Sequence, residues 1–341
     1  MLRDEWSPEV PYLNTASFGL PPRSAFAELQ AALADWRAGR VSWEPWCEST
    51  ERARATFARM VSVPAEDVAV GATTSELVGL AAASVRDGAT VLVPEADFSS
   101  LVFPWASQTH RGVRVVEAPL ASLADAVGPD TDVVAFSVVQ SSNGLVADVQ
   151  SIAAAARDAE ALTVVDATQS CGWFPLDASP FDMVVCSGYK WLLAPRGVAF
   201  AYIGERLQSQ TAPLHAGWYA GEDPFGSYYG LPPRLAPTAR RFDTSPAWFS
   251  WVGAAPALDL LVDIGIERIH EHNVALANRF RAGLGLEPSD SAIVSVDVEG
   301  AAERLSAARI QASTRAGGLR ASFHVYNSED DVDAALTALV G

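Results

Sequence analysis

Lysine is almost absent from this chain of 341 residues, in which 24 residues are basic and only one of them, Lys190, is a lysine. An arginine guanidinium stays protonated near neutral pH, whereas a buried lysine amine can lose its proton and attack a carbonyl carbon. A genome bias towards arginine explains the other basic residues. Lys190 is therefore either an incidental exception to that bias or a residue whose chemistry arginine cannot perform.

Cysteine is also scarce, because the chain contains only Cys47, Cys171 and Cys186. An odd number of widely spaced cysteines provides neither a disulfide framework nor a CxxC metal-binding pair. We therefore expect no metal site and a reducing compartment.

Positive charge and long apolar runs are lacking as well. The 41 acidic residues outnumber the 24 basic ones and produce a net charge of -17, which repels nucleic-acid phosphates and anionic membranes. No uncharged apolar stretch reaches the roughly 18 residues that a membrane helix needs, and the N-terminal MLRDEWSPEVPYLN lacks the apolar core of a signal peptide. We expect a cytoplasmic protein that binds neither nucleic acid nor membrane.

Hydrophobic residues make up 49% of the chain, and short apolar runs rich in β-branched residues alternate with amphipathic stretches. Strand–helix alternation at this spacing predicts an α/β fold with a mainly parallel seven-stranded sheet between helices. The predicted helices include Arg23–Gly39, Glu48–Met60, Ser75–Val85 and Val149–Ala159. The predicted strands are Val68–Val70, Thr90–Val93, Val113–Glu117, Val133–Val138, Thr163–Asp166, Met183–Cys186 and Val198–Ile203.

The pattern changes after Ser245. One long helix-like segment extends to about Leu284, and it precedes two strand-like pieces, Ala292–Val298 and Leu319–His324, and a closing helix, Asp330–Val340. We predict a large domain and a smaller α+β domain, with these bounds: residues 21–244 for the large domain, and residues 1–20 and 245–341 for the small one.

A long loop rich in glycine, proline and aromatic residues lies between about Gly204 and Arg240 and contains HAGWYAGEDPFGSYYGLPPRLAP. Loops of this length and composition are typical of active sites. The aromatic side chains fit an apolar substrate pocket and a dimer interface equally well. They are Trp218, Tyr219, Phe225, Tyr228 and Tyr229.

Lys190 stands in CSGYKWLLAPRG, directly after a predicted strand, and Asp166 closes another predicted strand 24 residues earlier. Carboxyl ends of parallel strands meet at one edge of a sheet, where such folds bind their ligands. Pyridoxal phosphate (PLP) is a cofactor that uses both groups. A lysine forms a Schiff base with its aldehyde, and a carboxylate keeps its pyridine nitrogen protonated. Alone, Asp166 would indicate no more than a solvated strand end.

The cofactor's phosphate needs a site in a chain whose net charge repels it. GATTSEL places Thr74 and Ser75 at a strand-to-helix junction, where unpaired N–H groups and the helix dipole attract anions. An ordinary N-cap explains these two residues equally well. Ser187 and Tyr189, next to Lys190, add two more hydroxyls.

Together these segments resemble the class V aminotransferase family of fold-type I PLP enzymes, which includes cysteine desulfurases, kynureninase and isopenicillin N epimerase. The resemblance extends over essentially the whole chain, and its motifs occur in the family's order: YLNTASFG, GATTSE, EADFSS, VVDATQS, SGYKWLLAPRG, RFDTSP and LRASFHVYNSEDDVD. The resemblance implies a fold-type I large domain with a smaller α+β C-terminal domain. It also implies PLP as the cofactor.

The resemblance also assigns roles to individual residues. It implies that Lys190 forms the Schiff base, Asp166 contacts the pyridine nitrogen and Gln169 bonds the ring hydroxyl or the Schiff-base region. It places Phe98, in EADFSS, as a ring stacked on the pyridine. The implied phosphate ligands are Thr74, Ser75, Ser187 and Tyr189.

Two further implications concern a partner subunit and the substrate. Trp218 and Ser245 match residues that reach the phosphate from the partner subunit, which implies a homodimer with a shared active site. Arg320, in LRASFHVYN, matches the arginine that grips a substrate carboxylate with a two-bond fork. The implied substrate is an amino acid or a close relative.

The chain departs from the cysteine desulfurases, because no cysteine occurs between Ala282 and Leu319, where their nucleophile would stand. Phe98 and Tyr189 match kynureninase-like members, although the chain is short for a kynureninase. We therefore expect a class V aminotransferase. A β-lyase, a kynureninase-type hydrolase and an epimerase are the alternatives. A non-enzymatic binding module is disfavoured because Lys190 and Asp166 are both retained.

Overall fold

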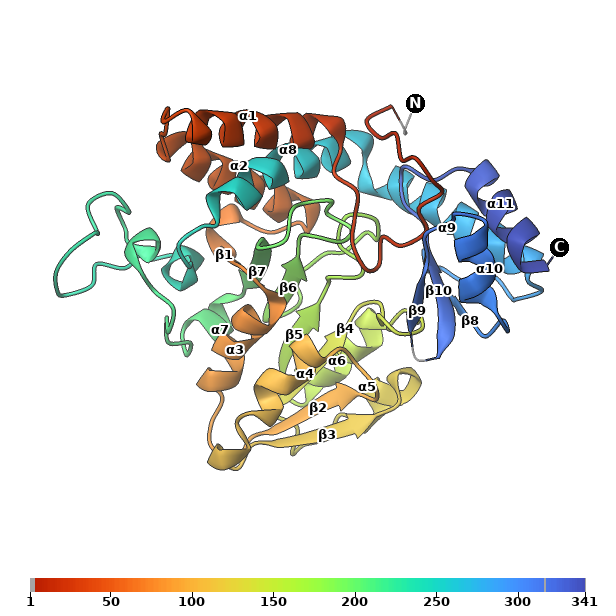
Figure 1. Ribbon diagram of the computed structural model, residues 1–341. Helices are drawn as coiled ribbons and strands as arrows, with labels where there is room; N and C mark the ends of the chain where they lie inside the picture. The colour runs from red at the N-terminus through yellow and green to blue at the C-terminus, as the bar shows by residue number, and fades with distance from the viewer. Residues whose placement is uncertain (1–3, 316, 341) are drawn as a thin grey trace.

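The computed structural model describes residues 4–315 and 317–340, and its centre is a seven-stranded sheet (Figure 1). The strand order is β1-β7-β6-β5-β4-β2-β3, and β7 is antiparallel to both of its neighbours while the other strands are parallel. The predicted mainly parallel sheet is confirmed. The strands are β1 Val68–Gly71, β2 Thr90–Pro94, β3 Arg114–Ala118, β4 Val133–Ser137, β5 Leu162–Asp166, β6 Met183–Ser187 and β7 Ala199–Ile203.

Helices cover both faces of this sheet, because successive strand residues point to opposite sides. Val68 and Val70 join a core with helices α2, α6 and α8, whereas Ala69 joins a second core with α3 and α4. Helix α1 packs against α8, outside the first layer. The helices of the large domain are α1 Arg23–Arg37, α2 Glu44–Met60, α3 Thr74–Ser84, α4 Ser99–Ala106, α5 Leu123–Ala126, α6 Val149–Asp158 and α7 Glu205–Gln208.

The single long helix expected after Ser245 is two helices, α8 (Trp248–Ile264) and α9 (Ile266–Gly283). Gly265 separates them with a φ of +94°, a left-handed conformation that glycine adopts at little cost. Among the described residues no single helix is long and apolar enough to cross a membrane. Only α8 and α9 taken together pass that test, and they are bent by 83° relative to each other.

The small domain places a three-stranded antiparallel sheet, in the order β8-β10-β9, beside helices α9, α10 (Ala301–Ala307) and α11 (Glu329–Val340). Helix α10 and strand β9 were not expected from the sequence. The division at residue 245 stays a prediction, and helix α8 buries its apolar residues in the core of the large domain. The strands are β8 Ile293–Val296, β9 Ser313–Arg315 and β10 Gly318–Ser322.

A strap formed by residues 12–20 runs from the small domain to the turn that carries Lys190 (Figure 1). Asn14 forms a parallel bridge with Ser322 of β10, and the Gly19 amide donates to the carbonyl of Tyr189 at 2.9 Å. A Cβ atom at Gly19 would lie 2.0 Å from the carbonyl oxygen of Lys190. The strap can lie this close to Lys190 only because residue 19 is a glycine.

Candidate active site

Lys190 is 5% exposed, and its amine lies 5.1 Å from the ring centre of Phe98 and 5.6 Å from that of Tyr189. This amine forms no hydrogen bond or ion pair with any residue that the structure describes. Burial lowers the pKa of Lys190 to about 8. The positive charge of Arg320 adds to this shift, and the carboxylate of Asp166 opposes it. The site therefore contains a buried amine that is readily deprotonated, as a carbonyl-bonding lysine must be.

Asp166 ends strand β5 and is 4% exposed. Its carboxylate accepts a hydrogen bond from the backbone N–H of Thr168 at 2.8 Å. Burial raises the pKa of Asp166, and the Thr168 bonds and the charge of Lys190 only partly counteract this. The charged form of such a buried carboxylate is stabilised by a cationic hydrogen-bond donor, such as a protonated ring nitrogen.

Hydroxyl groups from three elements meet at the N-terminus of helix α3. The hydroxyl of Thr74 lies 2.8 Å from that of Ser187 and 3.1 Å from that of Thr168, and the Ser187 amide donates to Thr168 Oγ1 at 3.1 Å. A helix N-terminus with convergent hydroxyls suits an oxyanion. Ser75 is elsewhere: its hydroxyl lies 3.4 Å from that of Thr73, on the exposed side of this turn.

Gln169 is fixed by three hydrogen bonds. Its Nε2 donates to the carbonyl of Ala16 at 3.0 Å and to Oγ of Ser141 at 3.2 Å, and its Oε1 accepts from Nε1 of Trp191 at 2.7 Å. The side chain therefore links the strap, the turn after β4 and the residue next to Lys190.

Arg320, on β10, is 1% exposed and has only neutral partners among the described residues. It donates to the carbonyl of Ser141 at 2.6 Å and to the hydroxyl of Ser17 at 2.7 Å. Burial, together with the nearby charge of Arg315, lowers the pKa of Arg320 to about 10. A buried guanidinium without a counter-charge is an anion site, because a carboxylate would neutralise it.

Most of the residues singled out in the sequence line one cavity: Thr74, Phe98, Asp166, Gln169, Ser187, Tyr189 and Lys190. Arg320 adjoins it through Ser141, which also lines it. Trp218 and Ser245 are not among the lining residues, although Nε1 of Trp218 lies 3.1 Å from the hydroxyl of Ser245. The segment that carries Trp218 loops away from the sheet in Figure 1. A role in the partner subunit's site stays a prediction for this pair.

Several polar residues of the site were missed, among them Thr168, Ser141 and Ser17. Thr168 stands within VVDATQS, two positions after Asp166, and Ser141 follows strand β4 at the same edge of the sheet as Asp166. Both could have been found from the rule that parallel strands place ligands at their carboxyl ends. Ser17 offered no such signal, because its place depends on the path of the strap.

The aromatic residues of the 204–240 loop do not line the Lys190 cavity within one chain. Trp218, Phe225 and Tyr228 instead surround Trp43, with ring centres 5.7, 5.2 and 6.1 Å away from its ring. Tyr229 remains 92% exposed. This arrangement disfavours a substrate pocket beside Lys190 within one chain, and the dimer-interface interpretation stays a prediction.

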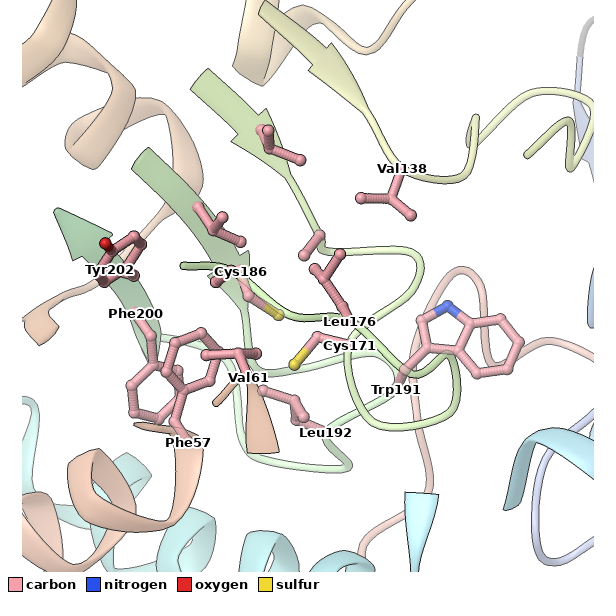
Figure 2. Packing of buried hydrophobic residues seen from close by; sticks show 14 of the residues in the cluster. Phe57, Val61, Val138, Cys171, Leu176, Cys186, Trp191, Leu192, Phe200 and Tyr202 are labelled. Carbon is pink, nitrogen blue, oxygen red and sulfur yellow. The ribbon is translucent and has the colours of Figure 1, made fainter. Parts of the chain in front are cut away.

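All three cysteines are buried, with exposures of 5% for Cys47 and 1% for both Cys171 and Cys186. Figure 2 shows Cys171 and Cys186 inside an apolar cluster that includes Phe57 and Leu192. Burial raises the pKa of Cys47 and of Cys186 above that of a free thiol. Buried thiols of this kind are poor nucleophiles.

Sequence comparison places the chain among known enzymes. The model of the aminotransferase class-V family matches residues 42–306. The uncharacterized aminotransferase YcbU of Bacillus subtilis is 28% identical, over 87% of this chain and 84% of that protein. Kynureninase of Deinococcus radiodurans is 30% identical, over 80% of this chain and 70% of that protein. Isopenicillin N epimerase of Amycolatopsis lactamdurans is 29% identical, over 97% and 95% of the two chains.

Solved structures share the fold at lower identity. A cysteine desulfurase from Thermococcus onnurineus has a TM-score of 0.84 at 23% identity, over 96% of this chain and 93% of that one. A variant of C-DES with glycine covalently linked to its PLP cofactor has a TM-score of 0.88 at 20% identity, over 97% and 96%. With its fold-type I architecture and a family match over most of its length, this chain belongs to the aminotransferase class-V family.

Proposed function

We propose that this protein is a PLP-dependent enzyme that acts on the amino group of an amino acid. The main support is Lys190, which is buried and has a lowered pKa, and which lies in one cavity with Asp166. Its amine has no hydrogen-bond or ion-pair partner among the described residues. An amine and a carboxylate at the carboxyl ends of parallel strands are the two groups that this cofactor requires.

The residues present fit the cofactor. Lys190 Nζ would bond its aldehyde carbon, Asp166 would hold the proton on its pyridine nitrogen and Phe98 would lie against its ring. The hydroxyl cluster at the start of α3 would donate to its phosphate. When bound, pyridoxal phosphate supplies a ring that withdraws electrons from the substrate's α-carbon.

The protein's own groups then control the proton and the orientation of the substrate. Lys190, with a pKa of about 8, can hold or release a proton near neutral pH, and it can therefore act as general base and acid at the α-carbon. Arg320 would bind the α-carboxylate with the help of Ser17 and Ser141, which set the position of its guanidinium. Charge-assisted pairs of this kind orient a substrate strongly.

Transamination is the reaction that we favour, because the described site contains no additional nucleophile. The three cysteines are buried in the described fold, which disfavours persulfide chemistry. A β-lyase, a kynureninase-type hydrolase and an epimerase remain the alternatives, and relatives with the latter two names align with most of this chain.

We also propose a homodimer in which Trp218 and Ser245 complete the phosphate site of the partner subunit. These two residues bond each other within one chain and lie outside the cavity that holds Lys190. Each would add a hydrogen-bond donor, an indole N–H or a hydroxyl, to the phosphate of the other subunit.

The cofactor assignment can be tested by spectroscopy. Protein reconstituted with pyridoxal phosphate should absorb at roughly 410–430 nm, as lysine-bound cofactors do, and the Lys190→Ala variant should not. Because Lys190 is the only lysine, borohydride reduction should label one lysine-containing peptide. A colourless reconstituted wild type, or a label on another side chain, would contradict the assignment.

Incubation with a panel of amino acids, followed by mass spectrometry, would separate keto acids from eliminated fragments and from epimers.

The shared site can be tested by complementation. One partner carries Lys190→Ala and the other carries Trp218→Ala together with Ser245→Ala. If the site is shared, a mixed dimer has one intact site and should bind cofactor at half occupancy. In each parent homodimer every site has a defect, so neither parent should bind cofactor as fully. If each chain completes its own site, every site in the mixed dimer has a defect, and occupancy should not recover.

A further inference from the structure

A second arginine lies beside Arg320 on the small domain. Strands β9 and β10 pair antiparallel, with Arg320 opposite Ser313 and Gly318 opposite Arg315. Side chains two positions apart on a strand point to the same face, so Arg315 shares a face with Ser313 and therefore with Arg320. The pairing register thus presents two guanidinium groups on one side of this sheet.

Both guanidinium groups bind the same hydroxyl. Ser17 Oγ, in the strap, accepts from Nη2 of Arg320 at 2.7 Å and from Nη2 of Arg315 at 3.3 Å. A serine hydroxyl has two acceptor positions and one donor proton. With both acceptor positions occupied, the proton of Ser17 is left to donate to a third group. Ser17 thus lies between two cations and can offer its own proton to an anion.

Among the residues that the structure describes, neither guanidinium has a counter-charge. Arg315 and Arg320 form no ion pair with any residue in the described ranges 4–315 and 317–340. This is unusual in a chain with a net charge of -17, because acidic partners are abundant. Like charges on adjacent strands repel each other. The charge of Arg315 also lowers the pKa of Lys190, so Arg315 lies near enough to influence the cavity.

An exposed arginine on a short edge strand ordinarily needs no explanation, because its charge is solvated. Two observations distinguish Arg315 from that case. Its Nη2 bonds inward to the strap, and it lies beside a buried guanidinium that it destabilises. An anion bound between the two arginines would remove that repulsion.

Given the proposed function, we propose that Arg315 binds an acidic group on the substrate's side chain while Arg320 binds the α-carboxylate, so that the preferred substrate is an amino acid with a second carboxylate. The two cations, bridged by the hydroxyl of Ser17, match the two anionic groups of such a substrate. Arg315 is thereby a specificity-determining residue and takes no part in the chemistry at the α-carbon.

The test compares ligands that differ in charge but hardly in shape. Reconstituted protein is titrated with aspartate and asparagine, and with glutamate and glutamine, and binding is followed by the change in cofactor absorbance. Wild type should bind the better acid about tenfold or more tightly than its amide, as expected for one added charge-assisted bond. Arg315→Gln should abolish that preference and leave the affinity for the amides unchanged. Arg320→Gln should weaken all four ligands.

Arg268→Gln is the matched control, because it removes the same charge from an exposed position of the small domain, in α9, without a described partner. An unchanged acid-over-amide preference in Arg315→Gln would overturn the proposal, and so would an equal loss for acids and amides.

A cofactor-free readout separates this result from a failure of the proposed function. Succinate should raise the unfolding temperature of the cofactor-free wild type more than succinamate does, and Arg315→Gln should remove that difference. If the two ligands act equally on wild type, the proposal is wrong whatever the cofactor does.

Discussion

Nε2 of His324 lies 3.0 Å from the carbonyl oxygen of Trp191, the residue that follows Lys190. A carbonyl oxygen can only accept, so Nε2 carries the ring proton, and Nδ1 accepts from Nδ2 of Asn273 at 3.4 Å. The neutral imidazole therefore ties the small domain to the turn that holds Lys190. Any displacement of the small domain would pull on that turn.

The protonation of His324 should make stability depend on pH. Burial lowers the pKa of His324 from 6.5 to about 3, and the nearby His272 adds to this shift. Between these two values the unfolded chain binds a proton at this residue and the folded chain does not, so stability falls as the pH falls. From pH 7 to pH 5 the loss should be about 2 kcal/mol in the free energy of unfolding.

Urea denaturation of wild type and His324→Gln at both pH values measures this contribution. The glutamine amide can still donate to the Trp191 carbonyl, but it does not titrate. Buried acids such as Asp166, whose pKa is raised, change the free energy of unfolding with pH in the opposite direction. Both proteins contain these acids. The difference between the two proteins therefore isolates His324. Equal pH dependence in both would refute the prediction.

The reactivity of Lys190 should rise with pH and level off near its pKa of about 8, which is set mainly by burial. In cofactor-free protein the rate of reductive alkylation by a small aldehyde should increase about tenfold per pH unit below that value, because only the neutral amine attacks. Asp166→Asn should lower the midpoint and Arg320→Gln should raise it, since their charges act in opposite directions. Mass spectrometry of the single lysine peptide provides the rate. A midpoint near 10.4, the ordinary lysine value, would contradict the burial effect.

Ser141→Ala should weaken substrate binding without releasing the cofactor. The Ser141 hydroxyl accepts from Arg320 and from Gln169, both at 3.2 Å, and its loss leaves two donors partly unpaired. A hydrogen bond to a charged group contributes about 1.5–3 kcal/mol, so amino-acid affinity should fall about tenfold or more. Ser142→Ala, at the neighbouring position, is the control and should bind amino acids as wild type does. Equal loss of cofactor and amino acid would show that Ser141 has a structural role.

Asp243→Asn should destabilise the fold. Asp243 is fully buried and accepts from Arg54 at 2.5 Å and from the amide of Val70 at 2.8 Å. Neutralising it leaves the buried Arg54 charge without its main partner, which costs about 3–5 kcal/mol. Asp333→Asn breaks an exposed pair with Arg279 and should cost far less stability, because solvent already screens that pair. Urea denaturation measures the free energy of unfolding of both variants. An equal loss in the two would disprove this distinction.

Much of the fold could be predicted because its signals are local. Each strand of the large sheet except the edge strand β3 is a short apolar run, and burial on both faces of a parallel sheet requires just such a run. The large-sheet strands were therefore placed to within about two residues. Strand β9 (Ser313–Arg315) was missed because only its pairing with β10 defines it. Gly265 was overlooked as a helix boundary because the helical pattern continues on both sides.

Residues whose type and place at a strand end carry distinctive chemistry were found, whereas contacts between distant segments were not. Lys190 and Asp166 stand at strand ends, and their chemistry is restrictive enough that residue type and position suggested a cofactor. Ser17 and Arg320 are 303 positions apart, and nothing in either segment indicates that they meet.

Sequence alone was sufficient for the alternating core, the seven strands, the family resemblance and the chemistry expected of Lys190, because these depend on local periodicity and on what a side chain can do. The path of the strap and the register of β9 on β10 could be known only from the folded chain. Those two features bring Ser17, Arg315 and Arg320 together. The physical reason is that long-range packing, which no local pattern encodes, decides which charges lie side by side.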